Sequence, residues 1–96
     1  MSAYIVTEVF ITDEPTMVEY RKLSTQAMQE FGAEIVIRGG APEMLEGETQ
    51  PDRVVVLKFR DREQARAFYA SAIYTDARKV REGAGTMRMI LVDGVA

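Results

Sequence analysis

Three side chains near the end of the chain could together bind an anion. Tyr74 and Arg81 are seven residues apart, so they share one face if this segment is helical, and Tyr69 lies close by in the sequence. A guanidinium holds a carboxylate or phosphate through two parallel hydrogen bonds, and a phenol hydroxyl adds a donor. The segment therefore predicts a site for a small acidic molecule. The structural alternative places Tyr69 in the core and the arginine on a solvated helix face.

A second candidate is the stretch Arg38-Gly39-Gly40, which is followed by Ala41 and Pro42. Glycines permit the left-handed backbone that aims N–H groups at an anion, and the arginine would add a charged fork. A phosphate-binding loop would continue into a helix, whereas an extended acidic run follows here. The pattern favours a turn at the end of a strand, with Arg38, Gly39 and Gly40 as one wall of a ligand site.

Charged residues also interrupt the apolar segments that we expect to be strands. Glu8 and Lys58 occupy, together with Arg38, alternate positions on the face directed away from the helices. Glu8 could serve as an acid–base group in a polar pocket of a dimer. The alternative is an ion pair that fixes the register of two strands or two subunits, because buried charges are usually paired.

The composition excludes several kinds of chemistry. The 96 residues contain no cysteine and no histidine, which removes disulfides, thiolate nucleophiles, haem held by histidine and the usual transition-metal ligands. We therefore expect no metal and no cofactor. The net charge of −3 predicts no nucleic-acid partner. The N-terminus lacks a basic leader and no apolar run approaches the ~18 residues of a membrane span, so we expect a cytoplasmic protein without membrane contact.

The apolar pattern predicts a single domain over residues 1–96. Segments rich in β-branched and aromatic residues indicate strands at 4–11, 34–38, 52–59 and 87–92. Asp13 and Gly32 bound a first helix, and Asp61 begins a second helical region that Ser71 recaps into a short helix through Arg81. The order β-α-β-β-α-β is that of the ferredoxin-like α+β fold, an antiparallel four-stranded sheet with its helices on one face.

Both faces of this predicted sheet are apolar. One set of alternate positions comprises Ile5, Thr7, Val9, Ile11, Ile35, Ile37, Val55, Leu57 and Phe59. The opposite set comprises Tyr4, Val6, Glu8, Phe10, Val36, Arg38, Val54, Val56 and Lys58, and the last strand is apolar on both sides. A solvated face should be mostly polar, and the helices can cover only one face. We therefore expect a second copy of the chain on the other face, in a homodimer.

Several motifs resemble a known family. Arg38-Gly39-Gly40, Leu45-Glu46-Gly47, Phe68-Tyr69-Ala70-Ser71, Tyr74 and Arg81 are similar to the family called domain of unknown function 1330. The resemblance spans Tyr4 to Val92, although Ala72 stands where relatives usually carry proline. It implies a dimeric α+β barrel, in which the sheets of two βαββαβ protomers face each other. It implies no established activity, and hence no catalytic residues.

Three classes of function remain open. The favoured interpretation is a small homodimeric protein that binds a small anionic or aromatic metabolite in a cleft of the barrel. The others are a cofactor-free enzyme of isomerase, lyase or monooxygenase type on a small organic acid, and a purely structural dimer; fold alone does not decide between them. The expected ligand-binding residues are Glu8, Arg38, Gly39, Gly40, Tyr69, Tyr74 and Arg81.

Overall fold

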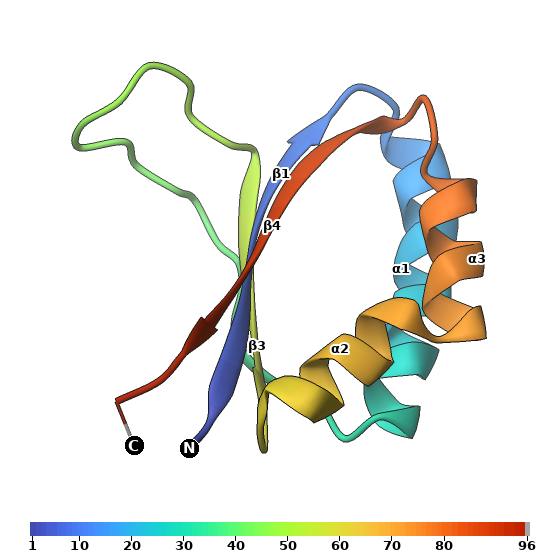
Figure 1. The fold of residues 1–96 in the computed structure, drawn as a ribbon. Helices are drawn as coiled ribbons and strands as arrows, with labels where there is room; N and C mark the ends of the chain where they lie inside the picture. Colours follow the sequence, from blue (N-terminus) through green and yellow to red (C-terminus); the bar gives the residue numbers. More distant parts are fainter. Residues whose placement is uncertain (96) are drawn as a thin grey trace.

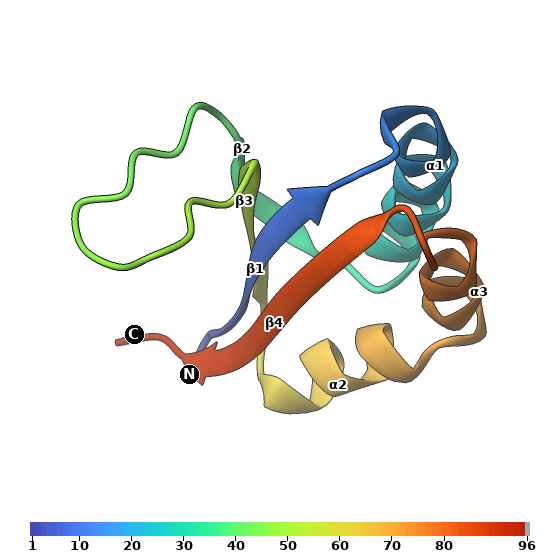
Figure 2. The same ribbon diagram turned by 90° about the horizontal axis from the view of Figure 1, so that it is seen from above.

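The structure, a computed structural model, describes residues 1–95. The elements follow the order β1 (Ala3–Ile11), α1 (Glu14–Glu30), β2 (Glu34–Gly39), β3 (Arg53–Phe59), α2 (Arg62–Ala70), α3 (Ala72–Val80) and β4 (Gly85–Asp93). The strands form one antiparallel sheet in the order β2-β3-β1-β4. The helices all lie on one side of it, and the loop between β2 and β3 projects on the other side (Figures 1 and 2). The predicted βαββαβ ferredoxin-like fold is confirmed.

The helix boundaries follow from side chains that satisfy free backbone N–H groups. The Asp13 carboxylate accepts hydrogen bonds from the backbone N–H of Thr16 (3.3 Å) and from its hydroxyl (2.8 Å), which begins α1. Asp61 accepts from the Gln64 N–H at 2.8 Å and begins α2. Each cap was predicted from the sequence. Within residues 1–95 no helix is long and apolar enough to cross a membrane.

Ser71 separates the last two helices and sets the direction of α3. Its hydroxyl donates to the carbonyl of Phe68 (2.7 Å) and accepts from the backbone N–H of Tyr74 (3.1 Å), so one side chain ends α2 and begins α3. The turn allows both Phe68 and Tyr74 to reach the core, where each is at most 1% exposed. The predicted break at Ser71 is confirmed, and it brings Tyr74 over the sheet.

The core lies between the sheet and the helices. The sheet contributes Ile5, Val9, Leu57 and Phe59, and the helices contribute Met17, Tyr20, Ala27, Phe68, Tyr74 and Ala77. The Phe68 ring packs between Phe59, at 5.3 Å between ring centroids, and Tyr74, at 4.6 Å. Full burial of side chains of this size contributes about 1.5–3 kcal/mol each. In β4, the side chains of Met87, Met89 and Leu91 pack against this core. They therefore form the helix-facing side of β4, which the sequence pattern alone did not decide.

The opposite face of the sheet is not covered by any element among residues 1–95 (Figure 1). It carries apolar side chains that remain exposed in the single chain: Ile37 (49%), Ile90 (41%) and Val92 (39%). The charged pair on this open face is Glu8 and Arg88, whose side chains lie 3.9 Å apart on neighbouring strands. The open face therefore keeps the apolar character expected from the sequence.

The register of β2 departs from simple alternation. Ile35 pairs with Leu57 and Ile37 pairs with Val56, so one extra residue lies between them as a β-bulge. Beyond the bulge every side chain changes face, because successive strand residues point to opposite sides. Ile37 therefore lies on the open face and Arg38 lies on the helix side, opposite Val55. The assignment of Arg38 to the open face and of Ile37 to the helix face was wrong.

Candidate functional site

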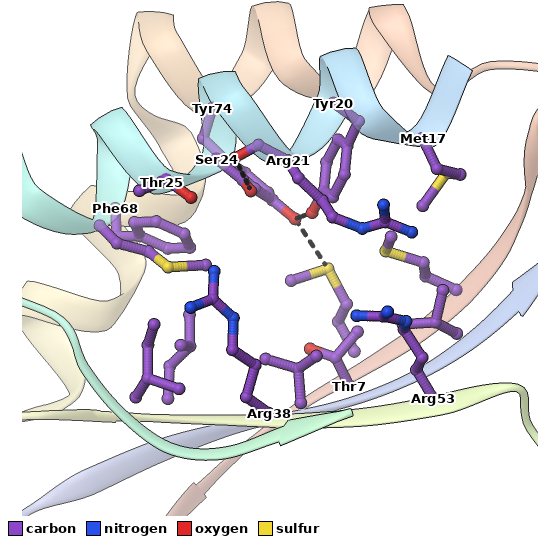
Figure 3. A pocket seen from close by; sticks show the side chains of 17 residues that line it. Thr7, Met17, Tyr20, Arg21, Ser24, Thr25, Arg38, Arg53, Phe68 and Tyr74 are labelled. Carbon is purple, nitrogen blue, oxygen red and sulfur yellow. Dashed lines mark hydrogen bonds between the residues drawn. The ribbon is translucent and has the colours of Figure 1, made fainter. Parts of the chain in front are cut away.

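A cavity of about 70 Å³ lies between α1 and the sheet (Figure 3). One water requires roughly 10–15 Å³ on this scale, so the space holds on the order of five waters, comparable to one substituted aromatic ring. Its helix-side wall includes Met17, Tyr20, Phe68 and Tyr74, and its sheet-side wall includes Thr7, Val55, Leu57 and Met89. The walls are therefore mostly aromatic, aliphatic and thioether groups, which is the usual character of a small-molecule site.

Three arginines approach this apolar cavity from different elements. Arg38 of β2 and Arg53 of β3 extend from the sheet toward α1, and Arg21 extends from α1 (Figure 3). Arg21 pairs with Glu14 at 2.5 Å. Neither Arg38 nor Arg53 forms an ion pair with any carboxylate in residues 1–95. Two guanidinium groups without counter-charges beside an apolar cavity create a local positive potential that favours an anion.

The turn after Arg38 makes room for Arg53. Gly39 has φ of +74°, a conformation that side chains other than glycine rarely adopt. A Cβ at this position would lie 3.3 Å from the Arg53 guanidinium nitrogen Nη1. Gly39 therefore contributes by allowing the chain to turn close to Arg53. Gly40, with φ of +45°, is exposed and has nothing within 4 Å of where its Cβ would be, so it contributes only to the turn.

Two tyrosines meet at the helix-side wall. The hydroxyl oxygens of Tyr20 and Tyr74 lie 2.6 Å apart, although the residues are only 8% and 1% exposed. Burial raises the pKa of both phenols above 10.0, because the phenolate would lose its hydration. Both hydroxyls are therefore protonated at neutral pH. They can donate hydrogen bonds to a ligand, but they are poor general bases.

Arg78 of α3 and Arg81, which caps the end of that helix, each stack on a tyrosine ring. The Arg81 guanidinium carbon lies 5.6 Å from the centre of the Tyr20 ring, and that of Arg78 lies 4.3 Å from the centre of the Tyr69 ring. Such stacking stabilises a cation by about 0.5–2 kcal/mol. Arg81 also has a buried Nε without a hydrogen-bond partner in residues 1–95. Its positive charge acts on the tyrosine pair, although Arg81 itself is not part of the cavity wall.

The predicted ligand residues separate into two groups. Arg38 and Tyr74 line the same cavity, and Gly39 and Arg81 lie directly behind its walls. Tyr69 is 38% exposed and belongs instead to a shallow apolar depression between α2 and β4. Glu8 lies on the open face beside Arg88, on the other side of the sheet from the cavity.

The cavity residues that sequence reasoning did not propose as ligand contacts include Tyr20, Arg21 and Arg53. Arg53 could have been found, because alternation with Val55 places it on the helix side. Tyr20 was interpreted only as part of the apolar stripe of α1, which it also is. Within residues 1–95 no three Asp or Glu side chains lie close enough together to share a metal ion.

The fold and the cavity place the protein among the ferredoxin-like α+β proteins. The chain belongs to the family described as Domain of unknown function (DUF1330), which it matches over residues 2–95. This confirms the resemblance drawn from the Arg38-Gly39-Gly40 and Phe68-Tyr69-Ala70-Ser71 motifs. A comparison with curated proteins gave no significant match.

Several solved structures share the fold. The RPA0582 protein of unknown function from Rhodopseudomonas palustris has a TM-score of 0.83 at 18% identity, over 99% of this chain and 83% of that chain. A dimeric protein of unknown function and ferredoxin-like fold from Bacteroides fragilis has a TM-score of 0.59 at 10% identity, over 97% and 96%. SnoaB, a cofactor-independent oxygenase from Streptomyces nogalater, has a TM-score of 0.59 at 14% identity, over 99% and 94%. At these identities the similarity shows the fold alone.

Proposed function

We propose that the protein is a homodimer whose subunits each bind a small, anionic, single-ring aromatic molecule in the cavity between α1 and the sheet. The observation that carries this proposal is the pair Arg38 and Arg53, which have no carboxylate partner in residues 1–95 and border an apolar cavity. A ligand carboxylate would supply the missing counter-charge through bidentate pairing. Its ring would pack against the Tyr74 and Phe68 rings.

The dimer in this proposal forms through the open face of the sheet. The exposed Ile37, Ile90 and Val92 support it, since monomeric proteins rarely leave a broad apolar face in water. The Bacteroides fragilis neighbour is described as dimeric, which agrees with the proposal. We expect the two subunits together to bury more than ~1,200 Å², the size of a stable specific interface.

The binding proposal is tested by titrating the protein with benzoate and with uncharged benzamide, followed by calorimetry or by NMR. Arg38→Gln should weaken benzoate binding by about 1.5 kcal/mol, the lower end of the ~1.5–3 kcal/mol range for charged hydrogen bonds, because Arg38 is exposed. Arg53→Gln should cost about 2 kcal/mol, because Arg53 is half-buried. Both variants should leave the weak binding of benzamide unchanged.

A charge-matched control is available on α2. Arg66 is exposed, lies outside the cavity and forms no ion pair with residues 1–95, so Arg66→Gln changes the net charge equally without touching the site. Equal weakening by Arg66→Gln and Arg38→Gln would mean that only the overall charge matters, and the proposed site would be rejected. Loss of the dimer in Arg38→Gln would instead make Arg38 an interface residue.

A cofactor-free enzyme acting on a small organic acid is the second candidate. The buried Tyr20–Tyr74 pair favours it, because protonated phenols in an apolar wall can stabilise an oxyanion that develops during a reaction. SnoaB shares the fold and is described as a cofactor-independent oxygenase. Incubation with hydroxybenzoates in air, followed by NMR for product and by oxygen uptake, distinguishes the two: a binding protein returns the compounds unchanged.

A further inference from the structure

In one of its two arrangements, the tyrosine pair in the cavity wall leaves a hydroxyl proton without a strong acceptor. The Tyr20 and Tyr74 oxygens are 2.6 Å apart, so one of the two O–H groups donates to the other oxygen. The remaining proton needs a different acceptor. When Tyr74 donates to Tyr20, the Tyr20 hydroxyl has the Ser24 hydroxyl as a hydrogen-bond partner. When Tyr20 donates to Tyr74, the Tyr74 hydroxyl is left with the Met89 sulfur at 3.5 Å. A thioether is a weak acceptor, whereas buried hydroxyls normally have a good partner.

This spare donor and the unpaired arginines border the same space. Tyr20 and Tyr74 enter the cavity from the helices, whereas Arg38 and Arg53 enter from the sheet (Figure 3). The Phe68 ring, 4.6 Å from Tyr74 between centroids, fills the wall beside the phenols. The cavity therefore offers neutral donors on one wall, cations on the other, and apolar groups between them.

The phenol pair has the properties of a donor and not of a base. Burial raises the pKa of Tyr20 and of Tyr74, so both keep their protons at neutral pH. The guanidinium of Arg81, 5.6 Å from the Tyr20 ring centre, adds a positive field that polarises the phenols toward donation. A donor that already accepts a hydrogen bond is strengthened further, because hydrogen bonds in a chain polarise one another.

We propose that the Tyr20–Tyr74 pair selects ligands with a second acceptor oxygen, so that the ligand is an aromatic acid carrying a ring hydroxyl or carbonyl besides its carboxylate. The inference rests on the proposed function, since the arginines hold the carboxylate. The hydrogen bonds then run from Tyr20 through Tyr74 to the ligand oxygen. A ligand without this oxygen leaves the spare hydroxyl facing carbon, which lowers its affinity.

The test compares benzoate with 3-hydroxybenzoate and 4-hydroxybenzoate on the intact protein. At least one hydroxybenzoate should bind the wild-type protein about tenfold more tightly than benzoate, the effect of one hydrogen bond at a buried group. The double variant Tyr20→Phe/Tyr74→Phe should bind all three compounds with the affinity of benzoate. Tyr69→Phe is the matched control: it removes the same atom from a neighbouring ring outside the cavity, and the preference should remain.

The outcomes separate the two proposals. Equal affinity of the wild-type protein for all three acids, or a preference that survives in the double variant, overturns the role of the phenols and leaves the arginine site standing. Absence of binding by every acid overturns both. If the double variant does not fold, as thermal unfolding will show, the wild-type protein still gives a readout. The ring NMR signals of Tyr20 and Tyr74 should then shift with the preferred hydroxybenzoate and not with benzoate, and equal shifts with both would overturn the inference.

Discussion

Replacement of Ile90 by aspartate should convert the protein from a dimer to a monomer. Ile90 lies on the open face of β4, opposite Val6 of the central strand β1, and 41% of it is exposed in the single chain. If a second copy covers this face, the isoleucine becomes buried against it. An aspartate there would place a carboxylate on this face opposite Val6, which offers no positive charge to pair with it.

The size of the effect can be worked out from the exposure of Ile90. Full burial of an isoleucine contributes about 1.5–3 kcal/mol, so the 41% still exposed accounts for about 1 kcal/mol. Burial of a polar group without a partner costs a further ~1–3 kcal/mol, and more for a charge. A twofold dimer contains the substitution twice. The sum is at least about 4 kcal/mol per dimer, which raises the dissociation constant about a thousandfold.

Sedimentation velocity across a wide range of concentrations measures this change directly. The matched control is Val18→Asp on α1, because Val18 is 43% exposed and lies on the helix layer, away from the open face. Val18→Asp should remain dimeric. Circular dichroism and thermal unfolding should show that the Ile90→Asp monomer keeps its fold, since the side chain is already partly exposed in the single chain.

The opposite pattern would refute the reasoning. If Val18→Asp dissociates and Ile90→Asp does not, the helices form the interface and the open face has another partner. A wild-type protein that is monomeric at micromolar concentration would remove the dimer altogether.

Three further predictions concern stability. Gly85→Ala should destabilise the fold by about 3 kcal/mol or more in urea unfolding, because the added Cβ would collide with a backbone carbonyl of β1. Gly83→Ala is the control: its φ is +78° but the space around it is free, so the substitution should cost only about 1–2 kcal/mol. Because the pKa values of Tyr20 and Tyr74 are raised in the folded state, the folded state binds more protons than the unfolded state above pH 10.0. The free energy of unfolding should therefore fall as the pH rises above 10.0, by up to about 1.4 kcal/mol per pH unit for each tyrosine. Tyr74→Phe should reduce this slope, and an unchanged slope would show that other groups cause it. Ser71→Ala should lower the unfolding free energy by about 1 kcal/mol, because α3 loses its N-cap.

The fold was predictable because its boundaries are set by local chemistry. Asp13, Asp61 and Ser71 each cap a helix through a hydrogen bond to a residue three positions later. Such short-range contacts can be recognised from the sequence. The alternation predicted for β1 likewise matches its burial from Ile5 to Phe10, and only Ile11 at the end of the strand is less buried than expected. Local signals of this kind fixed the order of the elements, from which the sheet order of the ferredoxin-like fold follows.

The site was less predictable because it depends on long-range geometry. Tyr20 and Tyr74 are 54 residues apart, and nothing local indicates that their hydroxyls meet at 2.6 Å. Tyr69 and Tyr74 looked equivalent in the sequence, yet only Tyr74 faces the core, because the turn at Ser71 changes the helix direction between them. The bulge in β2 carries no glycine or proline that would mark it, so alternation placed Arg38 on the wrong face.

That bulge connects the proposed interface with the proposed site. If the same sequence paired regularly, with Val36 opposite Val56, Arg38 would extend from the open face, where a dimer would have to bury an unpaired cation at a cost of several kcal/mol. With the bulge, the apolar Ile37 occupies the open face and Arg38 joins Arg53 beside the cavity. A single irregularity thus makes one face of β2 more suitable for a second subunit and the other more suitable for an anion. Deletion of Val36 would make β2 regular while Ile37 still pairs with Val56 and Arg38 with Val55, so dimerisation and anion binding should both be retained, whereas Arg38→Gln should impair binding alone. Loss of both properties in the deletion variant would show that the bulge itself is required, and not only the faces on which Ile37 and Arg38 lie.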